Sequence, residues 1–170
     1  MAQSIGKRFE SNIAKSAPDY ALVFRLPDSA QAFGSSNRLR FSRKNPFDYL
    51  IWDSRKHKLY ALELKTVKEK SISFERDPED SGDIHLHQIE GLNTWNKYDG
   101  ITCGFIIEFR ACERTVFIEI EQFNKLTQNI CKKRFGIDDL ENNKIIYTVI
   151  PQKKLRVNYR YDIDMLLSLL

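Results

Sequence analysis

The chain has 170 residues, of which 42% are hydrophobic and 12% are aromatic, and its formal net charge is +4. This length and composition fit one globular domain, residues 1–170, with its own core, and they exclude a disordered chain. The charge excess is too small to identify a nucleic-acid partner by itself.

Neither a secretory leader nor a membrane-spanning segment is predicted. No basic-apolar-small signal opens the chain, and the longest apolar runs, 101–109 and 165–170, are too short to cross a bilayer. The three cysteines (Cys103, Cys112 and Cys131) form no CxxC pair, which argues against a zinc ribbon and a disulfide framework. We therefore expect a soluble cytoplasmic protein with free thiols.

The first predicted element is an amphipathic helix. Ile5, Phe9 and Ile13 recur every four residues among charged side chains. The helix is expected to begin near Ser4 and to end before Pro18.

Three strands are predicted next, at 20–26, 47–53 and 59–66. The second and third are joined by a short charged turn, which is typical of antiparallel neighbours. The connection between the first two strands, residues 28–45, is polar and basic. A connection of this length inside a compact domain is usually functional or disordered.

The second half of the chain alternates helices and strands. We expect a loop at 68–82, a helix at 83–96, strands at 101–109 and 115–120, a helix at 121–132, a strand at 145–150 and a final helical turn at 165–170. The nearly continuous apolar run 101–109 indicates a central strand buried on both faces. The order of elements predicts an α/β fold with a mixed sheet flanked by helices.

An acidic hairpin is the most informative local feature. Alternation along the third strand places Glu63 and Lys65 on one face. With the turn centred between Arg55 and Lys56, Asp48 on the second strand lies opposite Glu63. Directly opposed side chains have Cβ atoms roughly 4.5–5.5 Å apart. A shift of the turn centre by half a residue would put the two acids on opposite faces.

Two opposed carboxylates destabilise a strand pair unless a cation lies between them. Carboxylate oxygens are hard ligands that suit Mg²⁺ or Mn²⁺, and the carbonyl of Leu64 offers one more oxygen. Lys65, on the same face, is placed to lower the pKa of a nearby water or to neutralise a pentavalent phosphate. Asp48, Glu63, Leu64 and Lys65 therefore predict metal-assisted hydrolysis of a phosphodiester.

The alternative is an ordinary surface hairpin in which Glu63 and Lys65 form a weak ion pair. Three features argue against it. Pro46 fixes the entry to the second strand, Leu50 and Trp52 share the face of the two acids, and both strands are strongly apolar.

Basic residues gather beside this hairpin. Residues 29–47 contain no acid but include Arg38, Arg40, Arg43 and Lys44. Such a stretch, with Phe33 and Phe41 nearby, suits phosphate contacts and a wedge between base pairs better than a solvated loop. Lys68 and Lys70, just past the acidic face, are expected to hold the backbone of the scissile strand.

Pro46-Phe47-Asp48 followed by Glu63-Leu64-Lys65 resembles the signature of the PD-(D/E)xK nuclease superfamily. Further segments, at 6–10, 42–48, 59–65, 87–89 and 104–109, resemble in their order and spacing the RecU family of Holliday-junction resolvases. The resemblance covers roughly residues 5 to 125.

This resemblance implies a restriction-endonuclease-like fold and a homodimer that binds four-way DNA junctions and nicks two strands symmetrically with magnesium. It implies that Asp48 and Glu63 are metal ligands and that Lys65 is the base or charge stabiliser. Gln88 would orient the water or a ligand, and Glu10 would help through a water. Residues 28–45 would form a stalk that enters the junction centre.

The chain departs from the family in its short stalk segment, its minimal N-terminal extension and the leucine at position 64. These departures indicate a phage-encoded or otherwise diverged bacterial relative. Two other interpretations stay open: a catalytically idle branched-DNA-binding module on a nuclease scaffold, and a nuclease with another DNA target. The intact Asp48, Glu63 and Lys65 argue against the first, and the small size argues against a sequence-reading enzyme.

Overall fold

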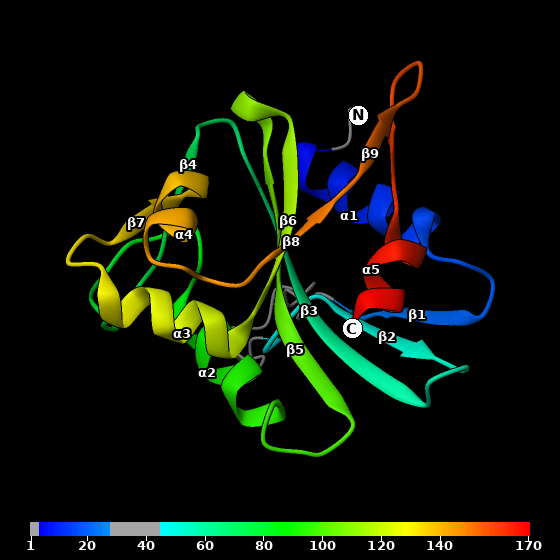
Figure 1. Cartoon of the computed structure of the whole chain (residues 1–170), viewed down its shortest axis with the longest axis horizontal. Coiled ribbons are helices and arrows are strands. Elements are labelled where there is room, and N and C mark those ends of the chain that lie inside the picture. The colour runs from blue at the N-terminus through cyan, green and yellow to red at the C-terminus, as the bar shows by residue number, and fades with distance from the viewer. Residues whose placement is uncertain (1–3, 28–44) are drawn as a thin grey trace, which may run out of the picture.

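The computed structural model describes residues 4–27 and 45–170, and a six-stranded mixed sheet forms its centre (Figure 1). The strands lie in the order β1-β2-β3-β5-β6-β8. They span Ala21–Arg25, Tyr49–Asp53, Lys58–Val67, Ile101–Phe109, Arg114–Glu119 and Thr148–Ile150. β3 and β5 run parallel, and the other neighbouring strands are antiparallel.

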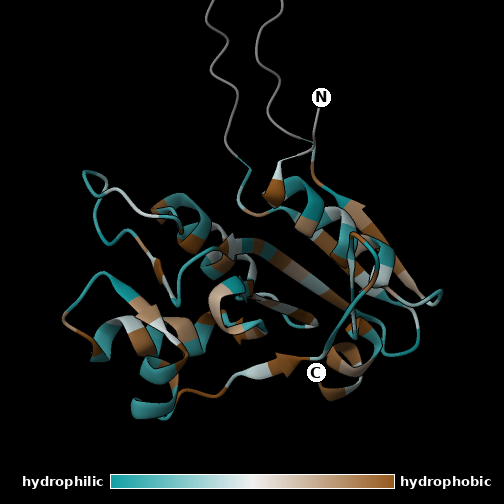
Figure 2. Cartoon of the chain, turned by 90° about the horizontal axis from the view of Figure 1, so that it is seen from above, coloured by the Kyte–Doolittle hydropathy of each residue, from teal (hydrophilic) through white to brown (hydrophobic). Residues whose placement is uncertain are grey.

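Helices cover both faces of the sheet, which confirms the predicted fold class (Figure 1). One face carries α1 and α5, which span Ile5–Ser16 and Ile163–Leu169. The other face carries α2, α3 and α4, which span Leu86–Trp95, Ile120–Asn129 and Ile137–Asn142. In Figure 2 the apolar colouring runs along the strands of the sheet, and the connecting loops are largely hydrophilic.

Alternation along β3 divides the apolar side chains between two cores. Leu62 and Leu64 pack in the core beneath α1 and α5, and Ala61 packs in the core beneath α2 and α3. Glu63 has the orientation of Ala61 and therefore lies on the α2 face. β5 contributes side chains to both cores, as expected for a central strand.

α1 has the predicted bounds for identifiable local reasons. The Ser4 hydroxyl accepts a hydrogen bond from the Lys7 N–H at 3.3 Å, which caps the first turn. Phe9 and Ile13, one turn apart, are buried against the sheet. The helix ends at Ser16, two residues before Pro18.

The predicted loop 68–82 contains a strand, β4 (Ser71–Ser73), which pairs with β7 (Arg134–Gly136). The hydrophobic periodicity of the sequence does not reveal such short strands, because their stability comes from pairing with a distant segment. α2 begins three residues later than predicted, because Asp83 instead accepts a hydrogen bond from the Ser73 N–H at 3.1 Å. α4 was not predicted, nor was the hairpin of β9 (Gln152–Lys154) and β10 (Tyr159–Tyr161).

Candidate functional site

The register of the β2–β3 hairpin decides whether the two acids meet. Tyr49 pairs with Leu62, and the same register continues to Asp53 and Lys58. The predicted register is therefore confirmed. It places Asp48, just before β2, beside Glu63 in β3.

Backbone contacts hold Asp48 in this position. Its N–H donates to the Leu62 carbonyl at 3.1 Å, and its carboxylate oxygen Oδ2 accepts from the Leu64 N–H at 3.0 Å. One Asp48 oxygen is thus engaged by the main chain of β3. The side chain is thereby held along the strand that carries Glu63.

The segment before Asp48 is packed tightly against α2. A Cβ at Gly91 would lie 2.4 Å from Cβ of Pro46, so only glycine allows this approach. The Phe47 ring packs edge-on against Trp95, with ring centroids 5.0 Å apart. α2 therefore positions the backbone that leads into Asp48.

Glu63 is the most buried acid of the site, with 2% of its surface exposed. Its Oε1 accepts a hydrogen bond from the Gln88 side-chain amide, and Lys65 Nζ lies 3.1 Å from the same oxygen. The other oxygen, Oε2, is buried and has no hydrogen-bond partner among the described residues. A buried carboxylate oxygen without a partner is costly unless a cation binds it.

The carboxylates are electrostatically unfavourable without a cation. Burial, reinforced by the charge of Asp48, raises the pKa of Glu63 from 4.5 to about 8, although Lys65 acts in the opposite sense. Burial also raises the pKa of Asp48, and the hydrogen bond from Leu64 offsets part of that rise. Burial at this position therefore disfavours the ionised form of both carboxyl groups.

Gln88 lies at the start of α2, and both ends of its amide are engaged. Oε1 accepts from the His85 N–H at 2.9 Å, and Nε2 donates to Glu63. The resemblance placed Gln88 near the acids, and the structure brings it into direct contact with one of them.

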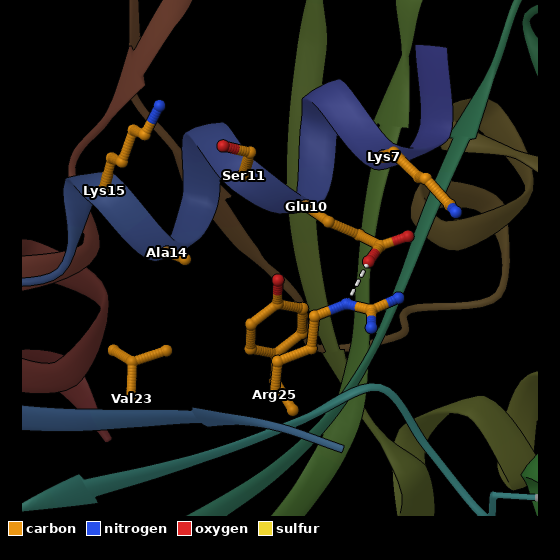
Figure 3. A pocket seen from close by; sticks show the side chains of 8 residues that line it. Lys7, Glu10, Ser11, Ala14, Lys15, Val23 and Arg25 are labelled. Carbon is orange, nitrogen blue, oxygen red and sulfur yellow. Dashed lines mark hydrogen bonds and ion pairs between the residues drawn. The ribbon is translucent and has the colours of Figure 1, made fainter. Parts of the chain in front are cut away.

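Glu10 approaches from α1, on the opposite face of the sheet. Its Oε2 forms an ion pair with Arg25 Nε at 2.9 Å, as Figure 3 shows. Arg25 ends β1 and pairs with Tyr49, the residue after Asp48. The Glu10 charge contributes to the raised pKa values of Asp48 and Glu63. This third acid is therefore close enough to interact electrostatically with both carboxyl groups.

A cavity of about 590 Å³ opens beside this ion pair, lined by residues of α1, β1 and β2 (Figure 3). Lys7, Lys15 and Arg25 contribute basic side chains to its wall. Arg25 was not anticipated from the sequence. No local pattern links a strand-terminal arginine to a helix acid fifteen residues earlier.

Lys68 and Lys70 are exposed in the turn that follows β3. They follow Lys65 on the chain, and their contact with DNA stays a prediction. Arg38, Arg40, Arg43 and Lys44 lie outside the described residues, as does nearly all of the predicted stalk segment 28–45.

The donor set fits a hard divalent cation only in part. Asp48 and Glu63 supply carboxylate oxygens, and the unpartnered Oε2 of Glu63 suits a metal ligand. Within residues 4–27 and 45–170, no group of three or more His, Cys, Asp or Glu side chains is close enough to form a metal site. Any cation here therefore needs further oxygens from main chain, water or substrate. The Leu64 carbonyl stays a predicted ligand.

Comparisons with known proteins bear on this arrangement. The chain is similar to Hjc of Archaeoglobus fulgidus, described as a Holliday junction resolvase, with a TM-score of 0.47 and 15% identity over 81% of this chain and 93% of Hjc. It is 34% identical over 180 residues to the SPbeta prophage-derived uncharacterized protein YotM of Bacillus subtilis strain 168. That alignment covers 97% of this chain and 86% of YotM.

The model of the family RecU, Recombination protein U, matches residues 63–165. The chain belongs to the RecU family. The RecU match begins at Glu63 and includes Lys65 and Gln88, whereas Glu10 and Asp48 precede it. The same match extends through β9 and β10 into α5. In the part of the chain that the structure describes, no helix is both long and apolar enough to span a membrane.

Proposed function

We propose that this RecU-family protein is a magnesium-dependent endodeoxyribonuclease that resolves Holliday junctions and related branched DNA in recombination and repair. The observation that carries the proposal is the pair of neighbouring acids, half-buried Asp48 and buried Glu63, with an unpartnered Glu63 oxygen and Lys65 on the same face. This is a costly arrangement that a cation relieves. Mn²⁺ is expected to substitute for Mg²⁺ because both prefer oxygen ligands.

Asp48 and Glu63 would hold the metal, with the Leu64 carbonyl as a further oxygen. Bound magnesium supplies positive charge that polarises the scissile phosphate and lowers the pKa of the attacking water. Lys65 Nζ, 3.1 Å from Glu63 Oε1, is placed to stabilise the negative charge that develops on the phosphate.

Gln88 and Glu10 have supporting roles in this proposal. Gln88 fixes the orientation of the Glu63 carboxylate through its amide. Glu10 adds negative charge beside the site, and its partner Arg25 is placed to contact a phosphate of the bound strand. Lys68 and Lys70, together with Arg38, Arg40, Arg43 and Lys44, would contact the DNA backbone.

A homodimer is part of the proposal, because symmetric nicking of a junction needs two active sites. Its support is an exposed apolar patch on β1 and β2. Leu22 and Phe24 are 69% and 56% exposed, and Trp52, which pairs with Leu22, is 36% exposed. Large apolar side chains gathered on one face of a sheet are typical of a subunit interface. The prophage-derived relative supports a phage or bacterial origin, and we place the protein in the bacterial cytoplasm.

The test is cleavage of a synthetic four-way junction and of a matched linear duplex by the purified protein, in Mg²⁺, in Mn²⁺ or in EDTA. We expect paired symmetric nicks in the junction alone, only with metal. Asp48→Ala should abolish the nicks and retain binding, while the control Asp99→Ala, at an exposed turn, should cut normally. Equal cutting of the linear duplex would overturn junction specificity. The absence of cutting with either metal would favour an idle DNA-binding scaffold.

A further inference from the structure

A basic hairpin near the C-terminus, residues 151–161, projects from the body of the protein at the upper right of Figure 1. We call it the C-terminal hairpin. β9 and β10 form it, with Lys154 paired to Tyr159 and Gln152 paired to Tyr161. The turn is closed by a hydrogen bond from the Leu155 N–H to the Asn158 carbonyl at 2.8 Å. The backbone pairing of the hairpin therefore continues to the turn.

All the charged side chains of this hairpin are basic. Residues 142–161 contain five basic residues and no acid. Four of the five, Lys153, Lys154, Arg156 and Arg160, are exposed on the hairpin. Within the described part of the chain, none of these four forms an ion pair with an acid. Exposed cations gathered on one element attract a polyanion.

The tip of the hairpin is apolar as well as basic. Leu155 is 47% exposed and Val157 is 67% exposed, on either side of Arg156. Aliphatic side chains at the tip of a basic element are suited to insert between or against bases while neighbouring cations hold the phosphates. A purely solvated turn would gain nothing from these two side chains.

The base of the hairpin is anchored to the nuclease scaffold. Tyr161 is buried, and its ring packs edge-on against Phe9 of α1 with centroids 5.5 Å apart. Its N–H donates to Ser16 Oγ at 3.1 Å, and its hydroxyl donates to Glu108 Oε1 at 2.7 Å. The hairpin is therefore held in a fixed relation to α1 and to the sheet.

α1 contacts the hairpin on one flank and β1, the neighbour of β2, on the other. On one flank, Arg8 shares a cavity of about 170 Å³ with Tyr159 and Tyr161. On the other flank, Glu10 meets Arg25 beside Asp48. A helix with its side chains is about 10–12 Å wide, close to the roughly 12 Å width of the major groove of B-DNA. Groups on the two flanks of α1 are therefore about one groove width apart, a spacing that a single DNA arm can bridge.

We propose that the C-terminal hairpin is a second DNA-contact element, which binds the phosphate backbone of one arm of the branched substrate and presses Leu155 and Val157 against its bases. This inference rests on the proposed function, which makes branched DNA the substrate of the acidic site. Its cations position the arm, and its apolar tip favours DNA whose bases are accessible at a branch point.

The test measures binding of a fluorescent four-way junction by full-length protein, by anisotropy in EDTA over a series of salt concentrations. The double variant K154A/R156A should bind at least roughly tenfold more weakly, and its slope of log K against log salt should be shallower by about 2. The control K97A/K125A removes the same charge from exposed positions on the α2 and α3 side. It should retain the affinity within about twofold and leave the slope unchanged.

The double variant L155S/V157S tests the tip separately. It should keep the salt slope and lose more affinity for the junction than for a linear duplex. Unchanged junction affinity and slope in K154A/R156A would overturn the hairpin proposal. Conversion of that variant to monomers, measured by light scattering, would also overturn it and make the hairpin a subunit contact.

A failure of the proposed nuclease function would show in the cleavage assay and not in the binding series. Protein that binds the junction but never cuts it with Mg²⁺ or Mn²⁺ would overturn the nuclease assignment, while the binding series still decides the hairpin. If the unchanged protein binds neither DNA, both proposals are overturned.

Discussion

Gln88 donates its side-chain amide to Glu63 Oε1 while its amide oxygen accepts from the His85 N–H at 2.9 Å. The second bond fixes which end of the amide faces the acid. The start of α2 therefore orients a carboxylate on β3, and the oxygen left without a partner is Oε2.

Replacement of Gln88 tests this orientation. Gln88→Ala should reduce the apparent affinity for Mg²⁺ about 10- to 100-fold in a cleavage assay, because the Glu63 carboxylate loses its orienting partner. The control Gln128→Ala changes an exposed glutamine on α3 and should cleave normally. The variant also loses a capping bond, so its melting temperature must be measured alongside. Unchanged magnesium dependence in a folded Gln88→Ala protein would contradict the role of Gln88.

Glu63 should make metal-free stability depend on pH. Its pKa rises from 4.5 to about 8 in the folded protein because of burial and the nearby Asp48. Between these values the folded state holds a proton that the unfolded state has released, so the free energy of unfolding should fall as pH rises through this window. Glu63→Gln should remove most of the decline in EDTA. It should be more stable than the unchanged protein at pH 8 by on the order of a few kcal/mol.

Magnesium provides the matched control for this prediction. The cation binds the folded state, so it should raise the melting temperature of the unchanged protein at pH 8 and have little effect on Glu63→Gln. Because burial also raises the pKa of Asp48, a smaller decline with pH should persist in the variant. A flat stability profile of the unchanged protein in EDTA would contradict the shift of Glu63.

Lys65 is expected to act in chemistry more than in binding. Lys65→Ala should lower the cleavage rate by about 10²- to 10³-fold, the range seen when one charge-stabilising group is removed, and should change junction affinity only a few-fold. Lys68→Ala, in the exposed turn three residues later, should show the opposite pattern, with weaker binding at low salt and a nearly normal rate at saturation. Equal rate losses in both variants would remove the distinction between the two lysines.

The hairpin register was predictable because both of its determinants are local. The alternating orientation of side chains along residues 59–66 determined which residues share a face of the strand. The position of the charged turn determined that Asp48 lies opposite Glu63. The ion pair of Glu10 with Arg25 was not predictable, since packing of α1 against the sheet decides it. The pairing of Ser71–Ser73 with Arg134–Gly136 was missed for the same reason. A three-residue strand shows too little hydrophobic periodicity to be recognised from the sequence.

The apolar patch on β1 should control dimerisation. Phe24→Asp introduces a charge at a side chain that is 56% exposed, so it should leave the fold intact and disfavour burial of the patch against a second copy. Light scattering should then report monomers at concentrations where the unchanged protein forms the proposed dimer. The control Ile146→Asp changes an apolar residue that is 73% exposed elsewhere and should keep the dimer. A dimeric Phe24→Asp protein would place the interface on another surface.

Gly91 and Gly6 form a matched pair for testing how α2 positions the acidic site. A Cβ at Gly91 would lie 2.4 Å from Cβ and 2.9 Å from the main chain of Pro46, whereas a Cβ at Gly6 meets nothing within 4 Å. Gly91→Ala should therefore cost about 1–3 kcal/mol of stability through overpacking. Gly6→Ala should stabilise α1 by about 0.5–1 kcal/mol because alanine favours helix.

The effect of Gly91→Ala on cleavage should exceed its effect on stability. Pro46 leads directly into Asp48, so displacement of Pro46 moves a proposed metal ligand, and small misplacements of reacting groups are costly. At a temperature where both variants are fully folded, Gly91→Ala should cut the junction about 10- to 100-fold more slowly, and Gly6→Ala should cut at the unchanged rate. Normal cleavage by folded Gly91→Ala would show that the approach of α2 to Pro46 serves stability alone.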